Sequence, residues 1–171
     1  MSRVVISLAA TALLCAGCSR SGTRVIWSGA RQVGQTPASV EFRLAEVTPQ
    51  PGLIPTLCGS NATSTTYVHP EAILPDAAVE RVDVLQWRGE GSRGSETAYI
   101  IEIAFSRDTG AKLAGITEQH NGSALALFVN GNAVVAPVIR EPVTGGVFWV
   151  SGAFEKREAM ALARSILGHP L

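Results

Sequence analysis

The 171-residue sequence lacks an excess of either charge, because 14 basic residues are balanced by 14 acidic ones. It has no dense basic run and no acidic tail, and Arg3 is the one basic residue within the first 17 positions. Proteins that bind nucleic acid usually carry a basic patch, and charge-rich tails mark other kinds of interaction segment. The charge balance therefore predicts that nucleic acid is not a partner.

Cysteine is also scarce, and its three occurrences are Cys15, Cys18 and Cys58. The first two lie in an N-terminal segment with the pattern of a secretory leader, which would leave Cys58 without an internal disulfide partner. A reactive thiol needs a lowered pKa and a nearby base such as His. A half-buried loop residue needs neither, and we interpret Cys58 in this way.

Signatures of catalysis are missing as well. The sequence contains no Gly-x-Ser-x-Gly, no glycine-rich phosphate loop with Lys and no His-Glu-x-x-His. His69, His120 and His169 fall in a loop, at a helix end and in the terminal tail, so we expect no metal site. Glu155 and Glu158 are typical of a solvated helix face. We predict a non-enzymatic protein with neither cofactor nor metal.

Only one long apolar run is present, at residues 4–14, and it is too short to span a bilayer, which takes about 20 residues. Arg3 precedes this run, and a segment of small residues leads from it to Cys18. This order is typical of a bacterial lipoprotein leader, although an ordinary signal peptide that happens to contain Cys is the alternative. We predict a signal peptide at 1–17, lipid attachment at Cys18, and a membrane-anchored protein on the periplasmic side of the cell envelope.

The remaining sequence is divided into a linker and one domain. Residues 18–37 are rich in Ser, Gly, Arg and Thr, which predicts a flexible tether. Residues 38–171 form a domain large enough for a hydrophobic core. Within it, residues 48–66 contain three Pro and two Gly and are predicted to be a loop.

Apolar periodicity predicts the class of this domain. Alternation of apolar and polar residues indicates strands at 40–47, 79–87 and 98–105. Ser106 is placed to cap a helix that reaches about His120, and residues 155–167 form a second, amphipathic helix. We therefore predict an α+β domain in which a mostly antiparallel sheet of about five to six strands packs against two helices.

Between the two predicted helices, apolar runs are separated by residues that break strands. Asn130 and Gly131 both tolerate positive φ and suit a type I′ hairpin turn. Pro137 has no amide donor and belongs at a sheet edge or strand end. Gly145-Gly146 permits a tight turn or a close approach of the backbone, before a further strand at 147–151.

The amino-acid sequence of this stretch resembles that of a known family. Its pieces are Val129-Asn130-Gly131, Val135-Ala136-Pro137-Val138-Ile139, Val143-Thr144-Gly145-Gly146, Val150-Ser151-Gly152-Ala153-Phe154 and Glu158-Ala159. In order and spacing they resemble the head subdomain of the first periplasmic domain of SecD, a membrane subunit of protein export. The turn and strand-end residues that match the family motif are Asn130, Gly131, Pro137, Gly145, Gly146, Gly152 and Phe154.

The resemblance implies a function in binding. The SecD head is thought to contact translocating polypeptide and to swing relative to a base that is coupled to membrane helices. This sequence stops where SecD continues into those parts, so we expect the head alone, without motor activity. The implied partners are polypeptide or the export machinery. The alternative is an envelope lipoprotein that reuses the fold to bind a small molecule or a glycan.

The predicted lipid anchor can be tested by metabolic labelling with palmitate. We expect the chain to incorporate the label and the Cys18→Ala variant to lose it, because the Cys18 thiol carries the lipid. Cys58→Ala serves as the matched control and should keep the label. Palmitate incorporation that survives Cys18→Ala would contradict the lipoprotein assignment.

Overall fold

The computed structural model covers residues 1–171 and describes residues 5–6, 23–32, 38–58, 64–88, 97–151 and 154–168. Within these ranges lie ten strands and two helices. The strands are β1 (Val5–Ile6), β2 (Thr23–Ala30), β3 (Val40–Glu46), β4 (Ile54–Cys58), β5 (Ser64–Val68), β6 (Val79–Arg88), β7 (Thr97–Phe105), β8 (Ala124–Val129), β9 (Asn132–Val135) and β10 (Val147–Ser151). The helices are α1 (Arg107–Gln119) and α2 (Lys156–Ile166).

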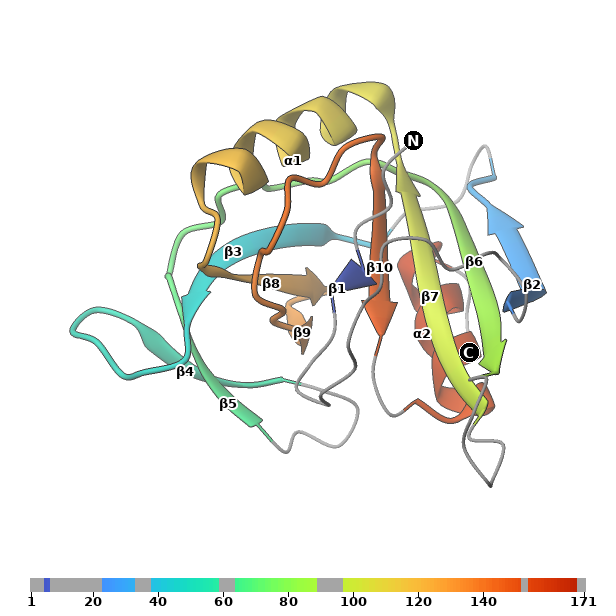
Figure 1. Ribbon diagram of the computed structural model, residues 1–171, viewed down its shortest axis with the longest axis horizontal. Coiled ribbons are helices and arrows are strands. Elements are labelled where there is room, and N and C mark those ends of the chain that lie inside the picture. Colours follow the sequence, from blue (N-terminus) through green and yellow to red (C-terminus); the bar gives the residue numbers. More distant parts are fainter. Residues whose placement is uncertain are drawn as a thin grey trace.

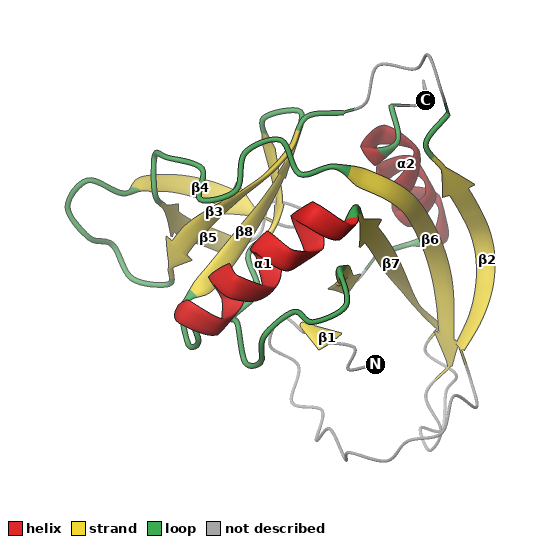
Figure 2. Ribbon diagram, turned by 90° about the horizontal axis from the view of Figure 1, so that it is seen from above, coloured by secondary structure: helices red, strands yellow, loops and turns green. Residues whose placement is uncertain are grey.

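The strands form two sheets of five strands each. Sheet A has the order β1-β10-β7-β6-β2, and sheet B has the order β4-β5-β3-β8-β9. All pairings are antiparallel except that of β1 with β10, which is parallel. In Figure 1, sheet B lies on the left and sheet A on the right, with α1 across the top. Seen from above, α1 lies between β8 and β7, and α2 packs beside β6 and β7 (Figure 2).

The core lies between the sheets and is closed by both helices. Phe42 of β3 contacts two rings of sheet A edge to face, with centroid distances of 5.7 Å to Phe105 and 5.2 Å to Phe148. All three side chains are at most 5% exposed. Aromatic contacts of this geometry contribute beyond the area they bury. The α+β class with two helices is thus confirmed, and the strands are divided between two sheets that meet at these rings.

Helix α1 begins where the sequence predicts. The Ser106 hydroxyl accepts a hydrogen bond from the Thr109 amide at 3.3 Å, which satisfies one of the free donors of the first turn. Further along, the buried Thr117 hydroxyl donates to the Leu113 carbonyl at 2.8 Å and accepts from the Val143 amide at 2.8 Å. These bonds fix the helix to the segment that leads into β10.

The prediction of a flexible tether at residues 18–37 is corrected for Thr23–Ala30, because these residues form strand β2 of sheet A. This strand pairs with β6 along its length, from Thr23 opposite Trp87 to Ala30 opposite Arg81. Its three large apolar residues, Val25, Ile26 and Trp27, are consecutive, so it lacks the apolar alternation that identified the other strands. Pairing with an already formed sheet decides its structure, and a local pattern does not reveal that.

The loop predicted for residues 48–66 is also corrected. It contains β4 and the start of β5, which pair with each other from Ile54 opposite Val68 to Cys58 opposite Ser64. Pro55 is compatible with β4 because β4 is the outer strand of sheet B, where a missing amide donor leaves no ladder bond unmade. Pro55 therefore indicates an edge strand of a sheet and not a loop.

A close backbone contact joins α1 to the turn before β10. Gly146 has φ of +68°, and its carbonyl accepts a hydrogen bond from the Phe105 amide at 2.9 Å. A Cβ added at Gly110 of α1 would lie 2.7 Å from the Cα of Gly146. Glycine is therefore required at position 110, because a larger side chain would prevent the turn from approaching α1 this closely.

We expect Gly110→Ala to lower the free energy of unfolding by about 1–3 kcal/mol, because the added methyl group has no room. Gly115→Ala is the matched control on the same helix, since nothing lies within 4 Å of its added Cβ. That change should be neutral or stabilising by about 0.5–1 kcal/mol. Urea denaturation measures both, and equal effects of the two substitutions would show that the contact is not tight.

Candidate functional site

The predicted turn at Asn130-Gly131 is confirmed as the tip of the β8–β9 hairpin. The two residues have φ of +50° and +77°, which is the positive-φ pair of a type I′ turn. The Asn130 side chain accepts a hydrogen bond from the Ser39 amide at 3.1 Å, and the Asn130 amide donates to the Ser39 carbonyl at 2.8 Å. The turn is thereby tied to the entrance of β3, and it acts as framework.

The other motif residues also belong to the framework. Pro137 is buried just beyond β9, and its carbonyl accepts a hydrogen bond from the Leu125 amide at 2.8 Å. Gly145 and Gly146 form the positive-φ turn before β10, and Phe154 is 8% exposed just ahead of α2. Gly152 lies outside the described residues. The structure does not gather the described motif residues into one site.

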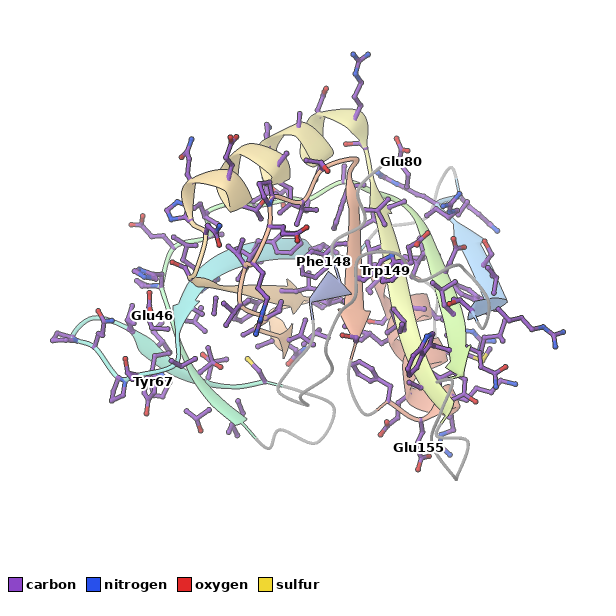
Figure 3. All side chains as sticks on the ribbon, viewed as in Figure 1. Glu46, Tyr67, Glu80, Phe148, Trp149 and Glu155 are labelled. Atoms are coloured by element: carbon purple, nitrogen blue, oxygen red, sulfur yellow. The ribbon has the colours of Figure 1, made fainter. Side chains whose placement is uncertain are left out.

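A cluster of polar groups instead lies on the face of sheet A that points away from the core. In β6, β7 and β10 the side chains alternate, so that Val84, Ile101 and Phe148 are buried in the core while their neighbours point outward. We call this second side the outward face of sheet A. Phe148 and Trp149, adjacent on β10, belong to the core and to the outward face respectively (Figure 3).

Two carboxylates occupy the centre of the outward face. Asp83 of β6 and Glu102 of β7 are directly opposite in the ladder, and they are only 7% and 6% exposed. The Arg81 guanidinium lies 3.0 Å from an Asp83 oxygen and 3.6 Å from a Glu102 oxygen. From the neighbouring strand, the Trp149 indole N–H donates to Glu102 Oε2 at 2.7 Å. Three strands thus contribute to one polar cluster.

One oxygen of this cluster has no partner among the described residues, because Asp83 Oδ1 is buried and makes no hydrogen bond there. A buried polar atom is costly unless it is hydrogen-bonded, and like charges on directly opposite strand positions are unfavourable. Asp83 Oδ1 is therefore the acceptor in this cluster that an additional hydrogen-bond donor would satisfy.

Apolar side chains lie on the same face around the cluster. Val25 of β2 is 55% exposed and stands opposite Leu85, while Trp87 of β6 is 44% exposed. Large exposed apolar residues beside a polar centre are characteristic of surfaces that bind other proteins. The outward face combines apolar contact area with acidic groups.

The sequence indicates polar residues within the strands but does not show that Asp83, Glu102 and Trp149 lie close together. Asp83 and Glu102 each interrupt an apolar strand, and that interruption is the signal that was available. Which two strand residues stand opposite each other depends on the register between β6 and β7. Trp149 reaches Glu102 only because β10, far along the chain, pairs with β7.

A cavity of about 230 Å³ lies elsewhere, where the ends of β2 and α2 approach the start of β3. Its lining comprises Arg31, Ala38, Ser39, Val40, Asp76, Ala77, Ala78, Val79, Ile166 and Leu167. Ligand pockets are usually about 300–1,000 Å³, so this one is small for a glycan or a cofactor. The cavity gives little support to a small-molecule function.

The described part of the chain contains neither a group of metal-ligating residues nor a thiol with a lowered pKa. Within it, no three His, Cys, Asp or Glu residues are grouped as metal ligands. Cys58 lies in β4 and is 2% exposed, and burial raises the pKa of its thiol although a hydrogen bond with Thr66 acts in the opposite direction. A raised pKa disfavours the reactive thiolate.

Comparison with known proteins gives a consistent assignment. The family model of the SecDF P1 head subdomain matches residues 64–170. The protein translocase subunit SecD of Acidaminococcus fermentans is 31% identical over 64 residues, which are 37% of this chain and 15% of that protein. SecD of Magnetococcus marinus is 36% identical over 64 residues, covering 37% and 12%. SecDF of Thermus thermophilus is 32% identical over 63 residues, covering 37% and 9%.

Two solved structures have a similar fold. A structure of SecDF, a membrane component that enhances protein export, superposes with a TM-score of 0.52 at 19% identity and covers 80% of this chain and 64% of that one. SecDF in its super-membrane-facing form gives a TM-score of 0.53 at 21% identity, covering 80% and 19%. The chain spans 15% or less of the length of the curated relatives it matches. None of the described helices has the length and apolar character needed to traverse a bilayer.

The hydrogen bond from Trp149 to Glu102 should contribute to stability. We expect Trp149→Phe to lower the free energy of unfolding by about 1–3 kcal/mol, because a buried carboxylate loses a donor. Trp87→Phe, on the same face and 44% exposed, is the matched control and should change it by less than about 0.5 kcal/mol. Urea denaturation of both variants decides the matter. A Trp149→Phe variant as stable as the control would contradict this role of the indole.

Proposed function

Because the chain belongs to the family of SecDF P1 head subdomains, we propose that it binds polypeptide at the cell envelope and assists protein export. The observation that carries the proposal is the family match over residues 64–170, which includes both helices and most strands of both sheets. One solved relative is a membrane component that enhances protein export, which connects the fold to that process. In this proposal the domain contributes binding, and the energy for transport comes from other machinery.

The outward face of sheet A supports a role in binding. Exposed Val25 and Trp87 offer apolar contact area, and Asp83 Oδ1 on the same face is an acceptor without a hydrogen-bond partner. An unfolded polypeptide presents apolar side chains together with unpaired amide donors, and both features match such a surface. Recognition of this kind needs neither a nucleophile nor a cofactor.

Anchoring to the membrane completes the proposal. A lipid on Cys18 would hold the domain beside the membrane on the periplasmic side, near chains that emerge from the translocon. Residues 1–17 would then act as a signal peptide and be removed. Cys18 lies outside the described residues, so this part of the proposal depends on the sequence pattern.

Crosslinking in the native envelope tests the function. We expect formaldehyde treatment of cells that carry the tagged chain to capture exported precursor chains or translocon subunits, identified by mass spectrometry. The Cys18→Ala variant is the control, and it should capture fewer membrane subunits because the domain is no longer held at the bilayer.

Deletion of the chain should also slow the appearance of secreted proteins outside the cell. A deletion without effect on secretion, together with crosslinked material free of exported chains, would contradict the proposal. Recovery of a small ligand alone would favour the alternative of a ligand-binding lipoprotein.

A further inference from the structure

Strand β2 begins very close in the sequence to the predicted lipid attachment site. Five positions separate Cys18 from Thr23, the first residue of β2. An extended chain spans at most about 3.6 Å per residue, so the Cα atoms of these two residues are at most about 18 Å apart. This limit holds for any course of the residues between them. If Cys18 carries a lipid, the end of sheet A at which β2 begins must therefore stay near the membrane surface.

Two neighbouring strands form that end of sheet A. Strand β2 is the outer strand and pairs antiparallel with β6, with Thr23 opposite Trp87 and Arg24 opposite Gln86. Figure 1 shows the two strands side by side at the edge of the molecule. We call Thr23, Arg24, Trp87 and Arg88 the Thr23 end of sheet A. These are the side chains that the short connection to Cys18 would bring to a membrane.

The charged side chains at the Thr23 end are basic. Arg24 and Arg88 are both exposed. In the described strands β2, β6 and β7, no acidic residue lies within three positions of this end. The flanking segments 19–22 and 89–96 contain two Arg and two Glu in the sequence, and these charges cancel. The positive charge of Arg24 and Arg88 is therefore left to interact with an anionic surface.

Trp87 differs from the other two tryptophans of the chain in its exposure. Trp27 is half-buried and packs against the core, and the Trp149 indole donates a hydrogen bond to Glu102. The Trp87 side chain is 44% exposed. Tryptophan is enriched at membrane–water interfaces, because its ring contacts apolar groups while its N–H reaches polar ones. An exposed tryptophan beside two arginines suits the surface of a bilayer that contains anionic lipid.

We propose that the Thr23 end of sheet A docks on the membrane that holds the Cys18 lipid, with Arg24 and Arg88 at anionic lipid headgroups and the Trp87 ring at the interface. The inference rests on the lipid anchor of the proposed function and adds the orientation of the domain. Because the anchor keeps the membrane at high local concentration, weak contacts are enough to hold this orientation. Asp83, four strand positions from Trp87, would then lie about 13 Å farther from the bilayer. The outward face would stand beside the membrane surface.

A second copy of the chain is a poorer occupant of this end. In a two-fold dimer the same patch of both chains meets, which would bring Arg24 and Arg88 of one copy toward those of the other. Like charges placed together across an interface are unfavourable. An anionic lipid surface supplies the opposite charge and also accommodates the exposed ring of Trp87.

The experiment uses the lipid-bearing chain, purified from cells in detergent and reconstituted in vesicles. One set of vesicles is phosphatidylcholine alone, and the other contains about 30% phosphatidylglycerol. In the anionic vesicles we expect phosphatidylcholine brominated near the headgroup to quench tryptophan fluorescence, and amide hydrogen exchange to become slower at residues 23–25 and 86–88. Trp87→Phe should remove most of the quenching. Trp149→Phe, in the middle of sheet A, should keep it.

A matched pair of double substitutions tests the charge. Arg24→Gln with Arg88→Gln removes two positive charges from the Thr23 end, and Arg107→Gln with Arg140→Gln removes the same charge elsewhere. Arg107 begins α1, at the opposite end of sheet A, and Arg140 is exposed between β9 and β10 (Figure 1). Each arginine near an anionic surface should change the ratio of docked to undocked domain about fivefold. The first pair should therefore lower this ratio about 25-fold, and the second should leave it unchanged.

Three results would overturn the inference. Quenching that is equal with and without phosphatidylglycerol, or equally reduced by both arginine pairs, would contradict the contact with anionic headgroups. Quenching that is absent from the lipid-bearing chain would refute docking, while the lipid anchor stands. A chain that incorporates no palmitate would refute the anchor and docking together. Envelope crosslinking tests polypeptide binding separately, so failure of the export role is distinguishable from failure of docking.

Discussion

The contact of Phe42 with Phe105 and Phe148 is the interaction on which the rest of the structure depends. It joins sheet B to sheet A through two edge-to-face ring pairs in a core closed by both helices. Phe148 lies on β10, so the same contact fixes the strand from which Trp149 reaches Glu102 on the outward face. The close packing of Gly110 against Gly146 positions the turn before that strand. These apolar and backbone contacts therefore hold β10 in its place beside β7 in sheet A.

The outward face of sheet A follows from the strand pairing that this core requires. Once Val84, Ile101 and Phe148 are turned inward, the residues between them must point outward. Asp83, Glu102 and Trp149 meet there as a consequence of register. The outward face combines exposed apolar side chains with the unsatisfied Asp83 Oδ1, whereas the cavity near Arg31 is small for a ligand. The proposed binding of polypeptide would use these features together.

Local signals in the sequence predicted much of the fold. Alternation in residues 98–105, the cap at Ser106 and the Asn130-Gly131 turn each have a short-range cause, and the structure confirms them. Strand β2 was missed because its sequence does not alternate and its pairing with β6 decides its structure. Strand β4 was missed because Pro55 is tolerated at an edge. The candidate site could not be predicted, since the distance between Asp83, Glu102 and Trp149 in space depends on pairings between strands distant in sequence.

The central claim is that polypeptide, and not a small ligand, is bound on sheet A. It is tested most directly by following the backbone amide resonances of the full chain in solution as an unfolded exported protein is added. The account predicts shifts concentrated at outward-face residues such as Val25, Asp83 and Trp87. Shifts confined to the cavity lining around Arg31 and Asp76, or no shifts at all, would contradict it.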